Sequence, residues 1–347
     1  MGFRRWRCQV GRRPGESDKL FVMPTRREFL ATAALPAVVS AVPSAAAGET
    51  VRAVVAADGS GEFQTIQRAV DHVLDHPPEK VSRVILEIRP GVYHERVKVP
   101  QDSPRVTLQG SDAASTVITF SMGATAAGGT FFSPAIEVDG AAFEAENITF
   151  ENTFGVGTQA VALSIHSDRA VFRKCRFLGW QDTLYAASGR QYYRDCFIEG
   201  HHDFIFGNAA AVFDRCEIYS RGSGYIAAHR RTRADEPTGF VFRDCRLTGA
   251  PAASDAPGVF LGRPWRSCAR VVFLNCWMGA HIRPEGWDNW NHTPANEKTA
   301  WFAELGSTGP GANPAARVPW AHALTPAAAA AFAPEVFLKG SDGWSPS

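Results

Sequence analysis

A short phrase that recurs along the middle of the chain restricts the fold more than any other feature. Each copy places an aromatic residue three positions before a cysteine, and the cysteines follow one another at intervals of 21, 20, 29 and 31 residues. The copies occupy residues 172–175, 193–196, 213–216, 242–245 and 273–276. Self-similarity at such intervals is typical of solenoid proteins, in which each repeat stacks on the next.

Each repeat consists of strands. Residues 170–173, Ala-Val-Phe-Arg, are rich in the residue types that favour strands, and glycines separate the repeats. About 20 residues that already hold two or three strands leave little room for a helix, which argues against leucine-rich and ankyrin repeats. The sequence therefore predicts an all-β, single-stranded parallel β-helix.

The cysteines of the repeat are expected to form a ladder inside this β-helix. Equivalent positions of successive coils stack at the strand spacing of about 4.8 Å, where cysteine acts as a small apolar filler. An exported protein with six cysteines beyond Cys8 also invites a disulfide framework. The stacked spacing favours free, buried thiols.

The N-terminal 47 residues are predicted to be an extension and export signal, and residues 48–347 the β-helix domain. Residues 25–30, Thr-Arg-Arg-Glu-Phe-Leu, resemble a twin-arginine motif and precede an apolar run over residues 31–42. Small residues at 45–47 suit cleavage. The run is too short for a membrane anchor. We therefore expect export by the twin-arginine route to the periplasm or the exterior.

Few segments of the chain have a helical pattern. Residues 63–74 predict a helix that caps the N-terminal end of the solenoid, and the alanine-rich residues 325–332 predict a helical tail. Residues 91–93 are interpreted as a turn. Residues 287–292, Trp-Asp-Asn-Trp-Asn-His, suit a carbohydrate-facing loop and a packed loop equally. Strands are expected at 50–57, 81–88, 97–99 and 105–108.

A stretch with three related segments holds the candidate chemistry. The segments start at Gln159, Gln181 and His202, and their starts lie 22 and 21 residues apart. Asp182 and Asp203 each follow a repeat cysteine by seven residues, so a β-helix places both on adjacent coils. Two neighbouring carboxylates have their pKa values driven apart, which favours one acid and one nucleophile or base.

The polar residues around the two aspartates suit acyl transfer. Gln159 and Gln181 offer amide N–H donors, as an oxyanion hole requires. Arg263 could keep one aspartate ionised, although a solvated surface arginine fits its position too. Alternatively, the aspartates could have a purely structural role, as stacked turn residues whose side chains satisfy backbone groups. The flanking glutamines and aromatic residues argue against this alternative.

Charge and ligand spacing exclude several functions. The chain has 36 basic and 35 acidic residues and a net charge of +1, which predicts no nucleic-acid or membrane partner. His166, His229 and His281 lack the spacing of metal ligands, and adjacent residues such as His201 and His202 point to opposite faces of a strand. We expect no metal site.

The sequence resembles the pectin methylesterases (pectinesterases) over about residues 51–320. The shared motifs lie at residues 58–63, 91–95, 148–153, 159–163, 181–185, 203–209 and 261–265. The resemblance implies a right-handed β-helix that hydrolyses methyl esters of galacturonate units in pectin, without a cofactor. Its partner would be methyl-esterified homogalacturonan, and we expect a monomer.

The resemblance also implies a role for each site residue. Asp203 would be the nucleophile and Asp182 the general acid and later the base. Gln159 and Gln181 would stabilise the oxyanion, and Arg263 would hold Asp203 ionised. The residues implied for the sugar-binding cleft are Trp265, Phe206 and Tyr185. His201 and His202 depart from the family, which more often has Thr-Val before the nucleophile.

Other readings of a pectin-binding β-helix stay open at this point. A pectate lyase needs a calcium-binding carboxylate cluster, and a polygalacturonase needs more aspartates around a water molecule. A non-catalytic carbohydrate-binding solenoid is a third alternative. Methanol release from methylated pectin without calcium discriminates between these readings.

Overall fold

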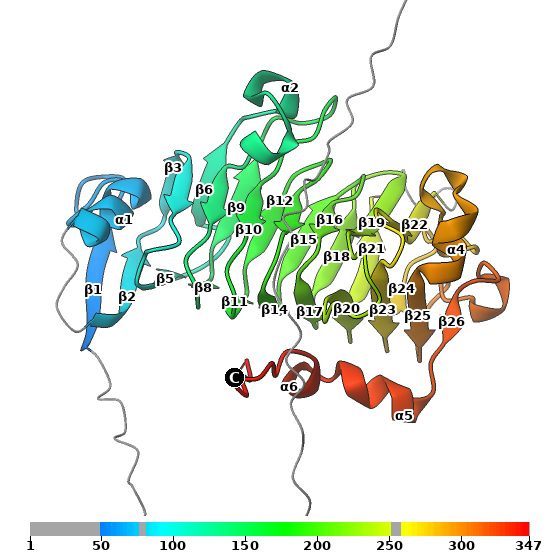
Figure 1. Ribbon diagram of the computed structural model, residues 1–347. Coiled ribbons are helices and arrows are strands. Elements are labelled where there is room, and N and C mark those ends of the chain that lie inside the picture. Colours follow the sequence, from blue (N-terminus) through cyan, green and yellow to red (C-terminus); the bar gives the residue numbers. More distant parts are fainter. Residues whose placement is uncertain (1–48, 76–80, 251–257, 347) are drawn as a thin grey trace, which may run out of the picture. The chain divides into compact units, whose positions relative to one another are not determined.

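The computed structural model describes residues 49–75, 81–250 and 258–346, whose strands form three parallel sheets of eleven, seven and eight strands. The predicted export signal lies outside these residues. Along a coil such as that of β10, β11 and β12 the chain visits each sheet in turn, and these strands pair with their equivalents β13, β14 and β15 one coil later (Figure 1). The fold is a right-handed parallel β-helix, which confirms the predicted class.

The eleven-stranded sheet has the order β1 (Glu49–Val55), β2 (Val81–Ile88), β5 (Arg105–Gly110), β8 (Glu144–Glu146), β11 (Ala170–Arg173), β14 (Arg190–Arg194), β17 (Ala210–Asp214), β20 (Gly239–Arg243), β23 (Arg270–Leu274), β25 (Trp301–Leu305) and β26 (His322–Ala323). The seven-stranded sheet has the order β22 (Val259–Pro264), β19 (Gly224–His229), β16 (Ile205–Gly207), β13 (Leu184–Ala186), β10 (Leu163–Ile165), β7 (Ile136–Val138) and β4 (Val97–Val99). The eight-stranded sheet has the order β24 (Trp277–Met278), β21 (Arg246–Gly249), β18 (Glu217–Ser220), β15 (Phe197–Gly200), β12 (Arg176–Leu178), β9 (Thr149–Asn152), β6 (Thr116–Phe120) and β3 (Gly91–His94).

One predicted turn is wrong. Residues 91–93 belong to β3, which pairs with β6 in parallel register. The alternation of a strand is visible in its side chains, because Val92 is 52% exposed and Tyr93 only 3%. The buried Tyr93 hydroxyl donates a hydrogen bond to the Arg89 carbonyl at 2.8 Å. This segment is therefore part of the first coil and not a loop between coils.

The repeated phrase forms the core of the β-helix. Its five cysteines are free thiols, each at most 2% exposed: Cys175, Cys196, Cys216, Cys245 and Cys276. The aromatic residues three positions earlier stack with ring centres 4.8, 4.7, 4.7 and 4.5 Å apart: Phe172, Tyr193, Phe213, Phe242 and Phe273. These separations match the spacing of paired strands, so the period of the sequence is the period of the coil.

A helix covers the N-terminal end of the solenoid, as predicted. Helix α1 (Ile66–Asp75) buries Ile66, Ala69, Val70 and Val73. Its first backbone N–H groups, at Ile66 and Gln67, donate to the Glu95 carboxylate at 2.8 and 2.9 Å. These two hydrogen bonds to Glu95 satisfy backbone N–H groups that have no partner within the helix at its first turn.

The tail is helical but interrupted. It comprises α5 (Pro326–Ala329), the 3₁₀ turn η4 (Ala330–Phe332) and α6 (Pro334–Phe337), because Pro334 disfavours a continuous helix. Phe332 and Leu338 bury their side chains against apolar residues of the eleven-stranded sheet, among them Tyr192 and Val241. Figure 1 shows this red segment running back along the strand ends.

Further short elements lie in the loops between coils. They are α2 (Ala124–Ala127), η1 (Thr130–Phe132), η2 (Trp290–His292), α4 (Pro294–Thr299) and η3 (Pro314–Ala316). Within the described residues, no helix is long and apolar enough to cross a membrane.

Candidate active site

The two aspartates of the three-copy stretch occupy turns that lead from the eight-stranded sheet into the seven-stranded sheet. Asp182 precedes β13 and Asp203 precedes β16, one coil later. The Asp182 N–H donates to the His202 carbonyl at 3.0 Å, so the coils are in register here. Both aspartates have a positive φ, 63° at Asp182 and 47° at Asp203, a conformation that aspartate tolerates better than most residues.

A cavity of about 330 Å³ opens over these turns. It brings together the five predicted catalytic residues and two of the three predicted sugar-binding residues. The lining residues are Thr130, Phe131, Gln159, Gln181, Asp182, His202, Asp203, Phe206, Ala228, Arg263, Trp265 and Trp290. They come from five successive coils and from two loops, so the site depends on the stacking of the solenoid.

Arg263 holds Asp203 with two hydrogen bonds. Its Nε donates to Asp203 Oδ1 at 2.9 Å, and its Nη2 donates to Oδ2 at 2.6 Å. Asp203 is 6% exposed, so a buried carboxylate meets a fixed, permanently charged partner. Each carboxylate oxygen of Asp203 thus accepts a hydrogen bond from a cation.

The Arg263 guanidinium is itself clamped between two aromatic rings. Its central carbon lies 3.9 Å from the Tyr225 ring centre and 3.8 Å from that of Trp290. The Tyr225 hydroxyl donates to Asp288 Oδ2 at 2.8 Å, which fixes that ring. Stacking and hydrogen bonding together leave the arginine little freedom to move away from Asp203.

Asp182 has the opposite environment. Burial raises the pKa of its carboxyl well above the usual value, the neighbouring Asp203 charge raises it further, and Arg263 lowers it in part. Among the described residues the Asp182 side chain has no hydrogen-bond or ion-pair partner. The two neighbouring carboxyl groups therefore have different surroundings: Asp203 is paired with a cation, whereas burial favours the protonated form of Asp182.

The two glutamines lie beside this pair. The Thr158 hydroxyl donates to Gln159 Oε1 at 3.0 Å, which leaves the amide nitrogen of Gln159 as its donor. Gln181 stacks on His202 through a parallel backbone bridge and lines the same cavity. Both amides are thus available at the wall of the cavity.

His202 contributes a contact that the sequence did not reveal. Its Nε2 lies 3.1 Å from Arg263 Nη2. Arginine only donates, so Nε2 is the acceptor and the imidazole is neutral in this arrangement. Burial lowers the pKa of His202; the Asp203 charge opposes this shift, and Arg263 and His201 add to it.

The aromatic residues form a row of neighbouring rings beside the acids, in which Tyr185 and Phe206 are stacked. Phe206 and Trp265 line the cavity, with ring centres 6.0 Å apart. Tyr185 is 6% exposed and stacks behind Phe206 at 4.6 Å, so it supports the cavity wall without lining it. Phe131, from the loop after β6, lies 5.1 Å from the Tyr185 ring.

Several lining residues were not predicted as site residues. Trp290 belongs to the tryptophan-rich loop, in which Trp287 is packed in the core and Trp290 lines the cavity. Thr130 and Phe131 carry no local signal, because their loop reaches the site only through the coil geometry. In the ranges that the structure describes, no three His, Cys, Asp or Glu side chains are grouped as a metal site.

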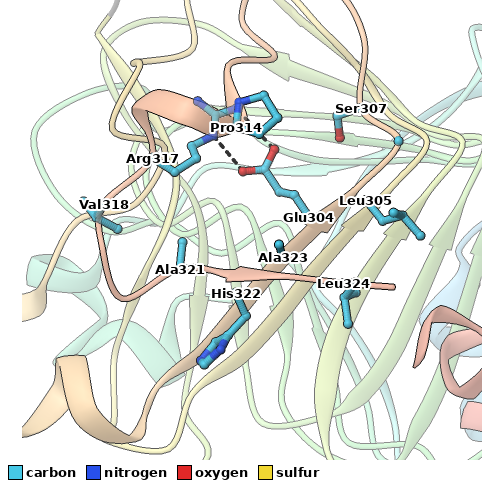
Figure 2. A pocket seen from close by; sticks show the side chains of 11 residues that line it. Glu304, Leu305, Ser307, Pro314, Arg317, Val318, Ala321, His322, Ala323 and Leu324 are labelled. Atoms are coloured by element: carbon cyan, nitrogen blue, oxygen red, sulfur yellow. Dashed lines mark hydrogen bonds and ion pairs between the residues drawn. The ribbon is translucent and has the colours of Figure 1, made fainter. Parts of the chain in front are cut away.

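A second cavity, of about 310 Å³, lies beside β25 and β26 near the C-terminal end of the solenoid (Figure 2). Arg317 and Glu304 form an ion pair in its wall at 2.7 Å. Arg317 also donates to the carbonyls of Arg283, Pro284 and Gly311, so its charge is already satisfied. This pair stabilises the last coil.

Comparisons with known proteins identify the family of this chain. The sequence matches the family described as Pectinesterase over residues 52–341. It is 41% identical over 281 residues to Pectinesterase 31 of Arabidopsis thaliana, covering 78% of this chain and 86% of that protein. The structure is similar to the pectin methylesterase from carrot, with a TM-score of 0.79, 36% identity and coverage of 84% and 93%. It is also similar to a pectin methylesterase solved with hexasaccharide VII, with a TM-score of 0.72, 27% identity and coverage of 86% and 99%. The chain therefore belongs to the pectinesterase family and is a carboxylic ester hydrolase.

Proposed function

We propose that this chain hydrolyses the methyl esters of galacturonate units in homogalacturonan through an acyl-enzyme on Asp203. The observation that carries the proposal is the division between two adjacent carboxyl groups. Arg263 donates two hydrogen bonds to Asp203, and burial raises the pKa of Asp182. An ionised nucleophile beside a protonated acid is what ester cleavage requires.

In the first half of the reaction, an Asp203 oxygen attacks the ester carbonyl carbon. The amides of Gln159 and Gln181 donate to the oxygen that becomes negative. When the tetrahedral intermediate collapses, the bond to the methoxy oxygen breaks and Asp182 gives that oxygen its proton. Methanol leaves, and an anhydride joins Asp203 to the galacturonate.

In the second half, water hydrolyses the anhydride. Asp182, now ionised, takes one proton from the water as its oxygen attacks the galacturonate carbonyl. The bond to Asp203 breaks and releases an ionised Asp203 and a galacturonic acid, which loses its proton to solvent. Asp182 is protonated again, so both carboxyl groups return to their starting states.

Methanol release from highly methylated pectin without added calcium tests this mechanism. The wild type is expected to release methanol, whereas Asp203→Asn is expected to release none. Asn keeps the shape and the positive φ of residue 203 but is not a nucleophile. Arg246→Gln, on the eight-stranded sheet away from the cavity, is the control. An unsaturated product absorbing in the ultraviolet indicates a lyase, and new reducing ends indicate a polygalacturonase.

We further propose that residues 1–47 direct export by the twin-arginine route. The Arg26-Arg27 pair, the short apolar run and the small residues at 45–47 support this proposal. We expect the exported protein to have a mature N-terminus near residue 48. We expect the Arg26→Lys/Arg27→Lys variant to be retained in the cytoplasm. A mature N-terminus well before Ala45 would contradict cleavage.

A further inference from the structure

Tyr225, on β19, packs against two residues of the site without lining the cavity itself. The guanidinium carbon of Arg263 lies over its ring, 3.9 Å from the ring centre. The same ring meets His202 in a T-shaped arrangement, with ring centres 4.8 Å apart. Because His202 Nε2 accepts from Arg263 Nη2, the tyrosine ring borders both partners of that hydrogen bond.

The hydroxyl group of Tyr225 holds this ring in place through Asp288. It donates to Asp288 Oδ2 at 2.8 Å, across 63 residues of sequence. Burial raises the pKa of the Tyr225 hydroxyl, and the hydrogen bond to Asp288 raises it further, so the hydroxyl stays protonated and remains the donor. A tyrosine ring tied at its hydroxyl cannot turn away from Arg263 without breaking this bond.

Asp288 is itself fixed by the loop that carries it. Its backbone N–H donates to the Gly262 carbonyl of β22 at 3.1 Å, and its Oδ1 accepts from the Asn289 N–H at 2.8 Å. The residues on either side are anchored as well. Trp287 is 1% exposed, and the Asn289 side chain donates to the Glu297 carboxylate at 2.9 Å. The Asp288 carboxylate is therefore a fixed acceptor and not a mobile surface charge.

We propose that Tyr225 and Asp288 are positioning residues for the nucleophile, because their hydrogen bond holds Arg263 in the orientation in which it donates to both oxygens of Asp203. This inference rests on the proposed function. Neither residue lines the cavity, so both act through Arg263. Without the bond the tyrosine ring is free to turn, and the arginine keeps only the stacking contact with Trp290. Asp203 then loses its fixed direction of attack on the ester carbonyl.

The kinetics of methanol release from methylated pectin test this role, with kcat and KM measured separately. Tyr225→Phe and Asp288→Ala each remove the hydrogen bond and are expected to lower kcat roughly fivefold, the effect of one hydrogen bond, with KM unchanged. Asp288→Asn keeps a partner for the Tyr225 hydroxyl, which accepts as well as donates, so its kcat is expected to stay within about twofold of wild type. Tyr225→Phe/Asp288→Ala should be no slower than either single variant, because both changes remove the same bond.

Tyr192→Phe is the matched control. The Tyr192 hydroxyl donates to Asp214 Oδ2 at 2.6 Å, between β14 and β17 of the eleven-stranded sheet. This variant also removes a hydrogen bond between a tyrosine and an aspartate, but at residues that do not line the cavity, and its kcat is expected to equal that of wild type. Equal losses of kcat in Tyr192→Phe and Tyr225→Phe, or a rise in KM in place of a fall in kcat, overturn the positioning role.

Crystal structures separate this inference from the esterase mechanism. In Asp288→Ala the Tyr225 ring is expected to turn, and Arg263 is expected to lose at least one of its two hydrogen bonds to Asp203. Two unchanged hydrogen bonds in that variant overturn the positioning role, whatever the activity. A wild type that releases no methanol overturns the proposed function alone, and the structure of Asp288→Ala then still decides whether the pair holds Arg263.

Discussion

Arg263 reaches Asp203 across 60 residues of sequence and donates to both oxygens of its carboxylate, at 2.9 and 2.6 Å. Arg263 lies in β22 and Asp203 in the turn before β16, and β19 separates these two strands in the sheet. Arg263→Lys keeps the charge but loses the planar fork and the stacking between Tyr225 and Trp290. We expect kcat to fall on the order of 10²-fold, as when one stabilising donor is removed from an active site. Arg246→Lys is the control. A kcat of Arg263→Lys within twofold of the wild-type value would contradict a catalytic need for the fixed Arg263–Asp203 pair.

The positive φ of Asp203 predicts a difference between two inactive variants. Asn accepts a φ of 47°, whereas Ala is strained there. Both Asp203→Asn and Asp203→Ala are expected to release no methanol. Asp203→Ala is expected to lose about 1 kcal/mol more free energy of unfolding than Asp203→Asn, measured with urea. Equal urea midpoints and slopes for the two variants would show that the positive φ at residue 203 costs alanine no more free energy than it costs asparagine.

The β-helix and the aspartate pair were predictable because both follow from a period. An offset of seven residues from stacked cysteines puts Asp182 and Asp203 on adjacent coils, and this requires no knowledge of loops. The strands predicted at residues 81–88 and 97–99 have the same bounds as the observed β2 and β4. Regular stacking converts sequence intervals directly into spatial neighbours.

Other parts of the site depend on geometry that no interval encodes. Phe131 and Trp290 reach the cavity from loops inserted between coils, and their positions depend on loop lengths. The contact of His202 with Arg263 depends on the side-chain arrangement of a residue 61 positions away. The turn predicted at residues 91–93 is instead the start of β3, and its pairing with β6 depends on a coil 25 residues later.

Asp182 is predicted to lower stability while it serves catalysis. Its pKa is raised in the folded protein, so between the unfolded value and the folded value the native state binds more protons than the unfolded state. The free energy of unfolding then falls as the pH rises through this window. Asp182→Asn removes the cost of ionising a buried carboxyl and is expected to be inactive but more stable than wild type at neutral pH. Urea unfolding at several pH values should show this gain disappearing below the unfolded pKa, and a gain that is independent of pH contradicts the assignment.

The C-terminal tail is predicted to stabilise the solenoid through a few buried side chains. Leu338 is fully buried in the apolar cluster on the eleven-stranded sheet, whereas Val336, two residues earlier, is 54% exposed. Leu338→Ala is expected to cost about 3 kcal/mol of unfolding free energy, as for other buried leucines. Val336→Ala should change the free energy of unfolding by less than about 0.5 kcal/mol. Similar urea midpoints for the two variants would show that the tail does not unfold together with the coils.

His202 is predicted to set the acid side of the pH profile. Protonation of Nε2 removes the acceptor for Arg263 Nη2 and places two cations 3.1 Å apart. The groups that face this imidazole are Arg263, Asp203, His201 and Tyr225. Because burial lowers the pKa of His202, kcat/KM is expected to fall only below the usual histidine range, as the pH decreases towards that folded pKa.

His202→Gln keeps an acceptor that cannot be protonated in this range, so the acid limb of kcat/KM is expected to move to lower pH. His94→Gln is the control, because His94 is exposed on β3 and is not among the residues that line the cavity. The direction of the shift is decisive. An unmoved limb, or one that moves upward, excludes the role proposed for His202.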